Sequence, residues 1–204
     1  FLNCRRAQGF WRMSENYAKV RVRRIVIAYP FVVALIAVAL NQFVFGVAPL
    51  VIALPDSLIF GAMAVALVLL TINHGWLMTS TELVRLKFDL RATPEEWRES
   101  ELDPAAAAPE GLLELQRRHN AHRNTSENMV YFGPLALLFL WASPPLAAGL
   151  AWMIGFGCAR VGYTYGYLSG RTGVRGAFMT LSLLCMFGLA SYLVLALLRL
   201  DFGL

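Results

Sequence analysis

Long runs of apolar residues are the feature of this chain that most constrains its fold. A helix needs about 20 mostly apolar residues to cross the hydrocarbon core of a bilayer, and several segments of the sequence reach that length. Only 15% of the 204 residues are charged, whereas soluble domains are typically about 25% charged. Backbone groups in lipid must pair internally, and the runs lack the alternation of a β-barrel strand. We therefore expect an all-α integral membrane protein.

Five membrane-spanning helices are expected. Their predicted limits are 25–45, 58–80, 112–142, 145–168 and 176–198. The second helix is expected to continue past Arg85 and Lys87 into water, and the first turns of the third are expected to lie outside lipid. Between these two helices lies a long polar region, in which Thr93 and Pro94 predict the cap and the first residue of a short helix.

The distribution of lysine and arginine predicts the orientation of the chain. Basic residues concentrate in the tail 1–24 and in the connections 81–118 and 169–175, whereas the connections on the opposite side contain none. With five spans the basic segments share one side, as the positive-inside rule requires, and only Arg199 disagrees. We therefore expect the N-terminus on the cytosolic or matrix side, in the endoplasmic reticulum or the mitochondrial inner membrane. The net charge of +5 then reflects topology, and no recognisable module supports a nucleic-acid partner.

Cysteine and histidine do not indicate a metal site in this sequence. Cys4, Cys158 and Cys185 are scattered, without a CxxC pair, and are expected to be small packing residues in or beside the membrane. His74, within the second predicted span, is expected to be a packing or interhelical residue.

The densest polar cluster, RRHNAHRNTSENMVY, lies at 117–131, where the third predicted span begins. On a helix, one face of this cluster carries Asn120, Arg123, Asn124 and Glu127. A charged side chain at membrane depth costs about 2.5–3.5 kcal/mol on insertion scales, so it needs a partner inside the bundle. Two interpretations remain open. Either the cluster forms a binding site, or Glu127 pairs with Arg123 or Arg160 and only fixes the packing of the helices.

A second polar face is predicted on the fourth span. In ARVGYTYGYL the helical spacing places on one face Arg160, Tyr163, Thr164 and Tyr167. Tyrosine at this depth is also typical of an interfacial aromatic belt, which is the interpretation for Tyr165. Arg175 opens the fifth predicted span, where a cation alone does not suit the positive end of a helix dipole. An anionic ligand at that end would be held by both the arginine and the helix.

These two segments together resemble the MAPEG family, the membrane-associated proteins in eicosanoid and glutathione metabolism. The resemblance rests on RRHNAHRNTSEN and on ARVGYTYGYLSGRTGVRG further along, and it covers 58–199. It implies a four-helix membrane domain over those residues, preceded by a basic extension at 1–24 and an additional transmembrane helix at 25–45. It further implies a homotrimer that binds glutathione between neighbouring subunits, near the basic face of the membrane.

The resemblance also implies roles for individual residues. Those expected to bind glutathione are Arg85, Arg123, Asn124, Glu127, Tyr163 and Tyr167. Among these, the residues of the polar cluster would hold the carboxylates and the amino group of the tripeptide. Arg175 is expected to be the catalytic residue, because it matches the arginine that stabilises the glutathione thiolate.

Three residues depart from the pattern of the resembled family. Asn120 stands where the prostaglandin-forming and conjugating relatives have an arginine, which removes one carboxylate contact, and Arg117 or Arg118 is a candidate to replace it. Gly176 and Met179 stand where the prostaglandin synthase has a serine and a tyrosine. Prostaglandin isomerisation is therefore not expected, whereas thiol transfer or peroxide reduction needs fewer of these residues.

Two functions from different classes follow. The first is a membrane-bound glutathione-dependent transferase or peroxidase that acts on hydrophobic electrophiles or lipid peroxides through an arginine-stabilised thiolate. The second is a non-catalytic accessory subunit that keeps the fold inside a larger membrane complex, such as a mitochondrial one. The additional first helix and the altered site residues favour the second function, and a lipid-binding scaffold is a third option. The expected partners are membrane lipids, glutathione, and either further copies of the chain or other membrane subunits.

Overall fold

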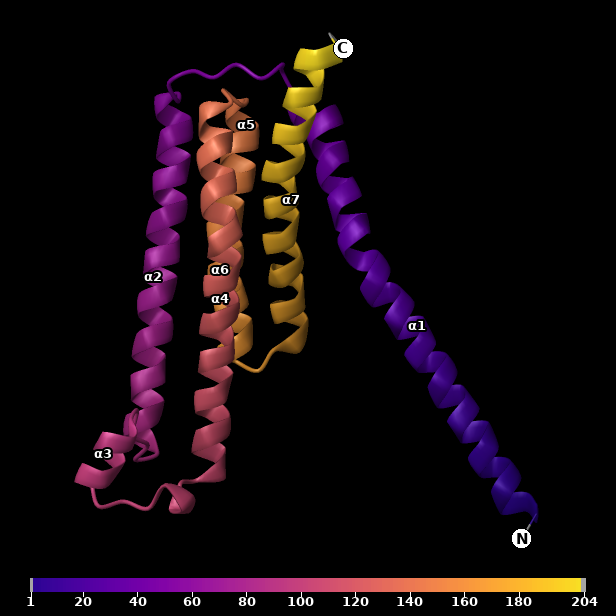
Figure 1. Cartoon of the computed structure of the whole chain (residues 1–204), viewed down its shortest axis with the longest axis vertical. Helices are drawn as coiled ribbons and strands as arrows, with labels where there is room; N and C mark the ends of the chain where they lie inside the picture. Colours follow the sequence, from indigo (N-terminus) through magenta and orange to yellow (C-terminus); the bar gives the residue numbers. More distant parts are fainter. Residues whose placement is uncertain (1, 203–204) are drawn as a thin grey trace.

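The computed structural model describes the backbone of residues 2–202 and the side chains of residues 19–200. Throughout this part of the chain the regular structure is helical, which confirms the expected all-α fold (Figure 1). The helices in chain order are α1 Leu2–Leu40, η1 Asn41–Phe45, α2 Ser57–Lys87, α3 Pro94–Glu99, η2 Pro104–Ala106, α4 Pro109–Trp141, α5 Leu146–Gly149, η3 Leu150–Ile154, α6 Gly155–Leu168 and α7 Thr172–Phe202. The π-helical turn η3 joins α5 to α6, so these three elements form one rod.

Four described segments are long and apolar enough to cross a membrane. They are Lys19–Phe45, Ser57–Lys87, Leu146–Leu168 and Thr172–Leu200. Each corresponds to one of the five predicted spans, and the chain is an integral membrane protein. The remaining predicted span, 112–142, corresponds to α4, which is too polar to meet the same criterion because the polar cluster fills much of its first half. α4 nevertheless packs against α2, α6 and α7 (Figure 1).

Local sequence signals account for two of the helix starts. The Asp56 carboxylate accepts a hydrogen bond from a backbone amide in the first turn of α2 at 2.8 Å and caps that helix. The Thr93 hydroxyl accepts from the Glu96 amide at 3.3 Å, and Pro94 is the first residue of α3. The predicted short helix is therefore confirmed. As predicted, α2 also continues past its apolar segment and past Arg85, but it ends at Lys87 and does not extend beyond that residue.

Aromatic side chains fill the centre of the four-helix bundle formed by α2, α4, α6 and α7. Phe132 of α4 and Phe156 of α6 are buried and stacked, with ring centroids 4.0 Å apart. Phe139 of α4 meets Tyr192 of α7 edge-on, at 4.9 Å between centroids. Such ring pairs contribute about 0.5–1.5 kcal/mol beyond their buried area. They fix how three of the helices are rotated about their axes, and so determine which polar residues face one another further along the bundle.

The additional N-terminal helix, α1, packs against α7 near its own C-terminal end and diverges from the bundle toward its N-terminus (Figure 1). α1 is continuous from Leu2 to Leu40, so no helix end coincides with the proposed boundary at residue 24 between the basic extension and the first span. Cys4 and the basic residues before residue 19 lie outside the described side chains.

A buried asparagine fastens this additional helix to the bundle. Asn41 is fully buried and donates to the Gly188 carbonyl at 2.7 Å and to Ser191 Oγ at 2.9 Å. Its own carbonyl oxygen accepts from Trp152 Nε1 at 2.9 Å. Without Asn41, the buried Trp152 Nε1 would lose its hydrogen-bond partner in an apolar environment, so this network fixes where the helix packs on α7 and η3.

Candidate functional site

A tight turn places the start of α7 beside the end of α6. Gly170 has φ +68°, a left-handed conformation that glycine adopts without strain. Two backbone hydrogen bonds close the end of α6. The Gly170 amide donates to the Tyr167 carbonyl at 3.3 Å, and the Arg171 amide donates to the Gly166 carbonyl at 2.9 Å. α7 begins at Thr172, earlier than the predicted start at 176, so its first turn lies directly against α6.

Along this junction two tyrosines lie between two arginines. Gly166 makes the close approach feasible, because a Cβ there would lie 2.6 Å from the backbone nitrogen of Arg175. The guanidinium carbon of Arg175 lies 5.1 Å from the Tyr167 ring centroid, and the rings of Tyr167 and Tyr163 are 5.5 Å apart. The guanidinium carbon of Arg160 lies 4.3 Å from the Tyr163 ring centroid. We call these four side chains the Arg–Tyr row. Residues predicted on one face of the fourth span therefore do lie together, with Arg175 beside them.

Beside the row is a small pocket of about 180 Å³, which we call the basic pocket. Its lining residues are Arg117, Gly166, Tyr167, Gly170, Thr172 and Arg175. Arg117 also pairs with Glu114 at 3.4 Å and keeps 37% of its side chain exposed. Arg175 forms no ion pair with any of residues 19–200. Two guanidinium groups and the N-terminus of α7 together favour an anion in this pocket.

The neighbouring Arg118 has a structural role instead. Its Nε donates to the Ser80 carbonyl of α2 at 3.0 Å, and its Nη1 donates to the Glu114 carboxylate at 2.6 Å. Arg117 and Arg118 were the two candidates to replace the arginine that the resembled family has at position 120. Only Arg117 lines the basic pocket. The sequence alone does not decide between them, because the direction of each side chain depends on how α4 is rotated.

Arg160 is fully buried, yet it has no acidic partner in the described chain. Its Nη2 donates to Asn124 Oδ1 at 3.0 Å and to Thr125 Oγ1 at 2.7 Å. Its Nη1 approaches Met179 Sδ at 3.9 Å, and its Nε has no hydrogen-bond partner. Met179, which departs from the family pattern, therefore belongs to the surroundings of this arginine. A buried guanidinium among neutral groups is unusual, because a buried charge ordinarily has a counter-ion.

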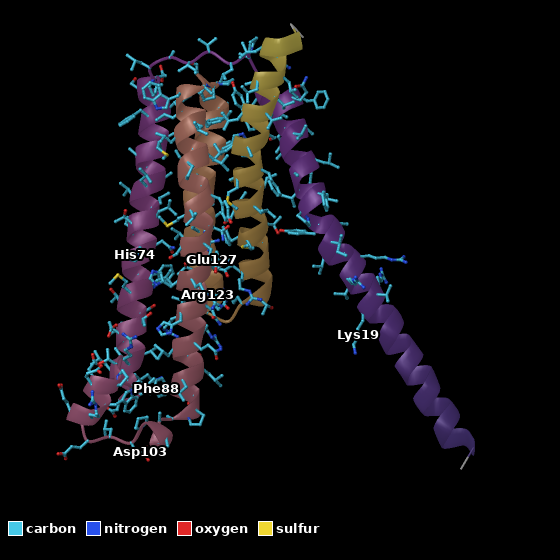
Figure 2. All side chains as sticks on the ribbon, viewed as in Figure 1. Lys19, His74, Phe88, Asp103, Arg123 and Glu127 are labelled. Atoms are coloured by element: carbon cyan, nitrogen blue, oxygen red, sulfur yellow. The ribbon has the colours of Figure 1, made fainter. Side chains whose placement is uncertain are left out.

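Among the described side chains, His74, His122 and Cys185 make their polar contacts outside the Arg–Tyr row. As predicted, His74 of α2 (Figure 2) makes an interhelical contact: its Nδ1 lies 3.0 Å from Nε2 of His122 in α4. Cys185 is buried in the core, as expected for a packing residue, whereas Cys158 is exposed. Between residues 19 and 200, no group of three histidine, cysteine, aspartate or glutamate side chains is arranged to bind a metal ion.

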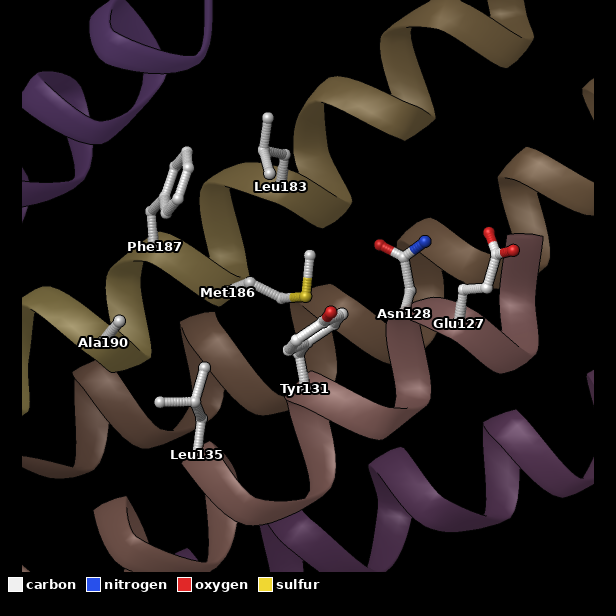
Figure 3. A pocket seen from close by; sticks show the side chains of 8 residues that line it. All are labelled: Glu127, Asn128, Tyr131, Leu135, Leu183, Met186, Phe187 and Ala190. Carbon is white, nitrogen blue, oxygen red and sulfur yellow. The ribbon is translucent and has the colours of Figure 1, made fainter. Parts of the chain in front are cut away.

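Glu127 is exposed on α4 and forms no ion pair with Arg123 or Arg160. The interpretation of an internal ion pair is therefore wrong. Glu127 lies at one end of a pocket of about 460 Å³ between α4 and α7, which we call the apolar pocket (Figure 3). The other lining residues are Asn128, Tyr131, Leu135, Leu183, Met186, Phe187 and Ala190. An exposed carboxylate without an ion pair at the edge of such a pocket is available to a partner from outside the chain.

Like Glu127, two further predicted site residues do not join the Arg–Tyr row within one chain. Arg85 pairs with Glu82 in the last turns of α2. Arg123 is exposed and donates to Asn120 Oδ1 at 3.2 Å. Neither arginine forms a hydrogen bond, ion pair or ring contact with a member of the row. The predicted ligands therefore divide into a group at the junction of α6 and α7 and three separate charged residues, Arg85, Arg123 and Glu127.

Comparison with known protein families identifies the family of the four-helix bundle. A sequence profile of the MAPEG family matches residues 60–195, about two thirds of the chain, from within α2 to within α7. The matched region leaves out α1, in keeping with an additional N-terminal helix. A search of curated proteins finds no significant match. On the extent of the profile match, this chain belongs to the MAPEG family.

Proposed function

We propose that this chain is a membrane-bound, glutathione-dependent transferase or peroxidase that acts on hydrophobic electrophiles or lipid peroxides. The observation that carries the proposal is Arg175, which lies in the first turn of α7, lines the basic pocket and pairs with no acid in the described chain. Membership of the MAPEG family supports glutathione as the ligand that this cation serves.

The charged side chains near the Arg–Tyr row fit glutathione, a tripeptide with two carboxylates and one ammonium group. Arg117 and Arg123 would bind carboxylates, because guanidinium groups match the geometry of that anion. The unpaired carboxylate of Glu127 would bind the ammonium group. Tyr163 and Tyr167 would line the cleft beside the cysteine of the tripeptide, within reach of Arg175.

Arg175 would act by stabilising an anion. When bound, glutathione supplies a thiol whose ordinary pKa is about 8.5, so only a few per cent is ionised at pH 7. Lowering that pKa to about 6.5 needs about 2.7 kcal/mol of preferential stabilisation of the ionised form. The guanidinium of Arg175 and the free amide groups at the N-terminus of α7 would together provide it, since both present positive charge in a poorly hydrated cleft.

The apolar pocket would receive the second substrate. Its volume is about 460 Å³ and its lining is apolar apart from the polar groups of Glu127, Asn128 and Tyr131. A hydrophobic electrophile or a lipid peroxide dissolved in the bilayer would enter such a pocket without passing through water. Glu127 connects this pocket to the polar cluster, because it lines the pocket and lies one helical turn beyond Arg123.

We further propose a homotrimer whose sites lie between neighbouring subunits, as the family resemblance implies. Within one chain, Arg85 and Arg123 lie apart from the Arg–Tyr row and Glu127 has no ion-pair partner. A neighbouring subunit that faces α4 or α7 would bring such groups together. From the distribution of basic residues we propose that the N-terminus faces the cytosol or the matrix, in the endoplasmic reticulum or the mitochondrial inner membrane.

The second candidate function is a non-catalytic accessory subunit of a larger membrane complex. The accessory role is favoured by the way α1 is held against α7 through the hydrogen bonds of Asn41, because α1 lies outside the region that matches the family. The residues at Asn120, Gly176 and Met179 also favour it. The mass in mild detergent separates the two functions. A particle of about three chains of 22.7 kDa supports the enzyme, and a stable complex with one copy among other subunits supports the accessory role.

The thiolate role of Arg175 is tested by adding glutathione to the protein purified in detergent and recording the ultraviolet absorbance of the thiolate near neutral pH. We expect the wild type to give this absorbance and Arg175→Ala to lose it. Arg171→Ala is the matched control, because Arg171 is exposed and its guanidinium carbon lies 5.5 Å from the ring centroid of Tyr165, outside the row. An undiminished thiolate signal in Arg175→Ala would remove this residue from the proposed chemistry.

A further inference from the structure

Arg160 carries a positive charge that no side chain in the described chain neutralises. Its guanidinium is fully buried, and no carboxylate between residues 19 and 200 pairs with it. The two oxygen atoms that accept from Nη2 are neutral: Asn124 Oδ1 at 3.0 Å and Thr125 Oγ1 at 2.7 Å. Burying a charge without a counter-ion is costly. Arg160 is therefore expected to do more than fill space, and its effect on Asn124 and Thr125 shows what that role is.

The chemistry of arginine determines the orientation of the Asn124 amide. A guanidinium group has only N–H donors and no acceptor, so the Asn124 atom that faces Arg160 must be the carbonyl oxygen Oδ1. The NH₂ group of the amide then points away from Arg160, and it donates to no group within residues 19–200. The NH₂ nitrogen is not enclosed in the core. Asn124 therefore presents a donor, and not an acceptor, to a ligand.

We propose that Arg160 is a positioning residue that holds Asn124 as a hydrogen-bond donor to an anionic or carbonyl group of glutathione. This role rests on the proposed function. It adds to that function the direction of one hydrogen bond, in which Asn124 is the donor and glutathione the acceptor. Asn124 would select a carboxylate, a thiolate or a peptide carbonyl, whereas Glu127, one turn later on α4, would select the ammonium group. The buried charge behind the amide also polarises its N–H bonds, which strengthens them as donors.

Two substitutions separate this role from simple packing. Positions 124 and 125 both place an oxygen within hydrogen-bond distance of the same Arg160 nitrogen. A carboxylate at either position would neutralise the buried charge. Asn124→Asp would also replace the outward NH₂ group by a negatively charged oxygen, whereas Thr125→Asp would leave the Asn124 amide in place. The two variants therefore match in charge and differ in what they present to the ligand.

The experiment uses the full chain purified in detergent and two measurements. Thermal unfolding without ligand should show a higher midpoint for both variants, because Arg160 is already desolvated and each variant supplies its missing partner. Calorimetric titration with glutathione should show binding weakened about 10- to 100-fold in Asn124→Asp, as expected for loss of a hydrogen bond to a charged group. Thr125→Asp should bind glutathione about as tightly as the wild type.

Any other combination of glutathione affinity and folding in these two variants would contradict the proposal. Unchanged glutathione affinity in Asn124→Asp would overturn the donor role of Asn124. An equal loss of affinity in both variants would show that the ligand responds to the charge of Arg160 and not to the amide, and would overturn the positioning role. Failure of both variants to fold would contradict the placement of Arg160 against these two side chains. A wild-type protein that does not bind glutathione would refute the proposed function itself, and this role with it.

Discussion

At the scale of single residues, the adjacent arginines at the start of the polar cluster are expected to behave differently. Arg117 lines the basic pocket with Arg175, whereas Arg118 joins α4 to α2 through the Ser80 carbonyl. Arg117→Ala should weaken glutathione binding about tenfold with little change in thermal stability, because a contact between a guanidinium group and a carboxylate is lost. Titration of the detergent-solubilised protein with glutathione measures the first quantity, and thermal unfolding measures the second.

Arg118→Ala is the matched control for this prediction. It removes hydrogen bonds from a side chain that is only 15% exposed, so it should lower the unfolding temperature and leave the affinity of the folded protein for glutathione nearly unchanged. The reverse pattern, with affinity lost in Arg118→Ala and kept in Arg117→Ala, would show that the wrong arginine has been assigned to the basic pocket.

The residue scale is also where prediction from sequence was least complete. Helical spacing was enough to place Tyr163, Tyr167 and Arg160 on one face, because α6 is a regular helix over that stretch. Spacing did not show that Arg160 turns inward to Asn124 or that Glu127 turns outward to an apolar pocket. Both outcomes depend on how α4 is rotated against its neighbours, which is set by packing between residues far apart in the chain.

At the scale of elements, the junction of α6 and α7 is expected to tolerate no side chain at Gly166. A Cβ at this position would lie 2.6 Å from the Arg175 backbone nitrogen, so Gly166→Ala must push the first turn of α7 away from α6. A displacement of about 1 Å at a reacting group can cost on the order of 10²-fold in rate. We therefore expect Gly166→Ala to lose most thiolate absorbance and most glutathione-conjugating activity.

Gly173→Ala provides the comparison on the same turn. Nothing lies within 4 Å of a Cβ at Gly173, and alanine favours a helix over glycine by about 1 kcal/mol. This variant should keep its activity and be at least as stable as the wild type. Full activity in Gly166→Ala would mean that the close approach of α6 and α7 is not needed for the function of Arg175.

The elements themselves were largely predictable from the sequence. All five long helices were predicted from the sequence, and the Thr93–Pro94 signal predicted α3. Four of the five are apolar along most of their length, whereas the polar first half of α4 lowers its mean hydropathy, so only its apolar second half indicated a span. The packing site of α1 was not predictable, because Asn41 appears in the sequence only as one of two polar residues, with Gln42, near the end of an apolar run. Its three hydrogen bonds arise only when η3 and α7 are brought to it.

At the scale of the whole molecule, α1 and the proposed site share α7 without overlapping. Asn41 contacts α7 at Gly188 and Ser191, which at 1.5 Å per residue lie about 20 Å along the helix from Arg175. The Tyr29 hydroxyl, nearer the site, donates to Thr180 at 2.7 Å. None of these contacts involves the first turn of α7. The additional helix therefore leaves the basic pocket available to a ligand, and an accessory role does not follow from its presence alone.

Mixing of subunits tests whether the site lies between copies of the chain. Arg85→Ala and Arg175→Ala should each strongly reduce activity when expressed alone, because each removes a cation from every site. If Arg85 of one subunit completes the site of Arg175 in the next, any mixed trimer contains one intact site in its closed ring. Random mixing at equal expression should then restore about a quarter of the wild-type sites. Glutathione conjugation measured in membranes that contain both variants checks this expectation.

The control for subunit mixing is co-expression of Arg175→Ala with a chain that carries both substitutions. That mixture contains no intact Arg175, so it should remain inactive at any ratio of the two chains. Recovery in the first mixture and not in the second would show that Arg85 and Arg175 act across a subunit boundary. Absence of recovery in both mixtures, although each pair assembles, would mean that the site is contained in one chain. Full activity of Arg85→Ala alone would mean that Arg85 is no part of the site.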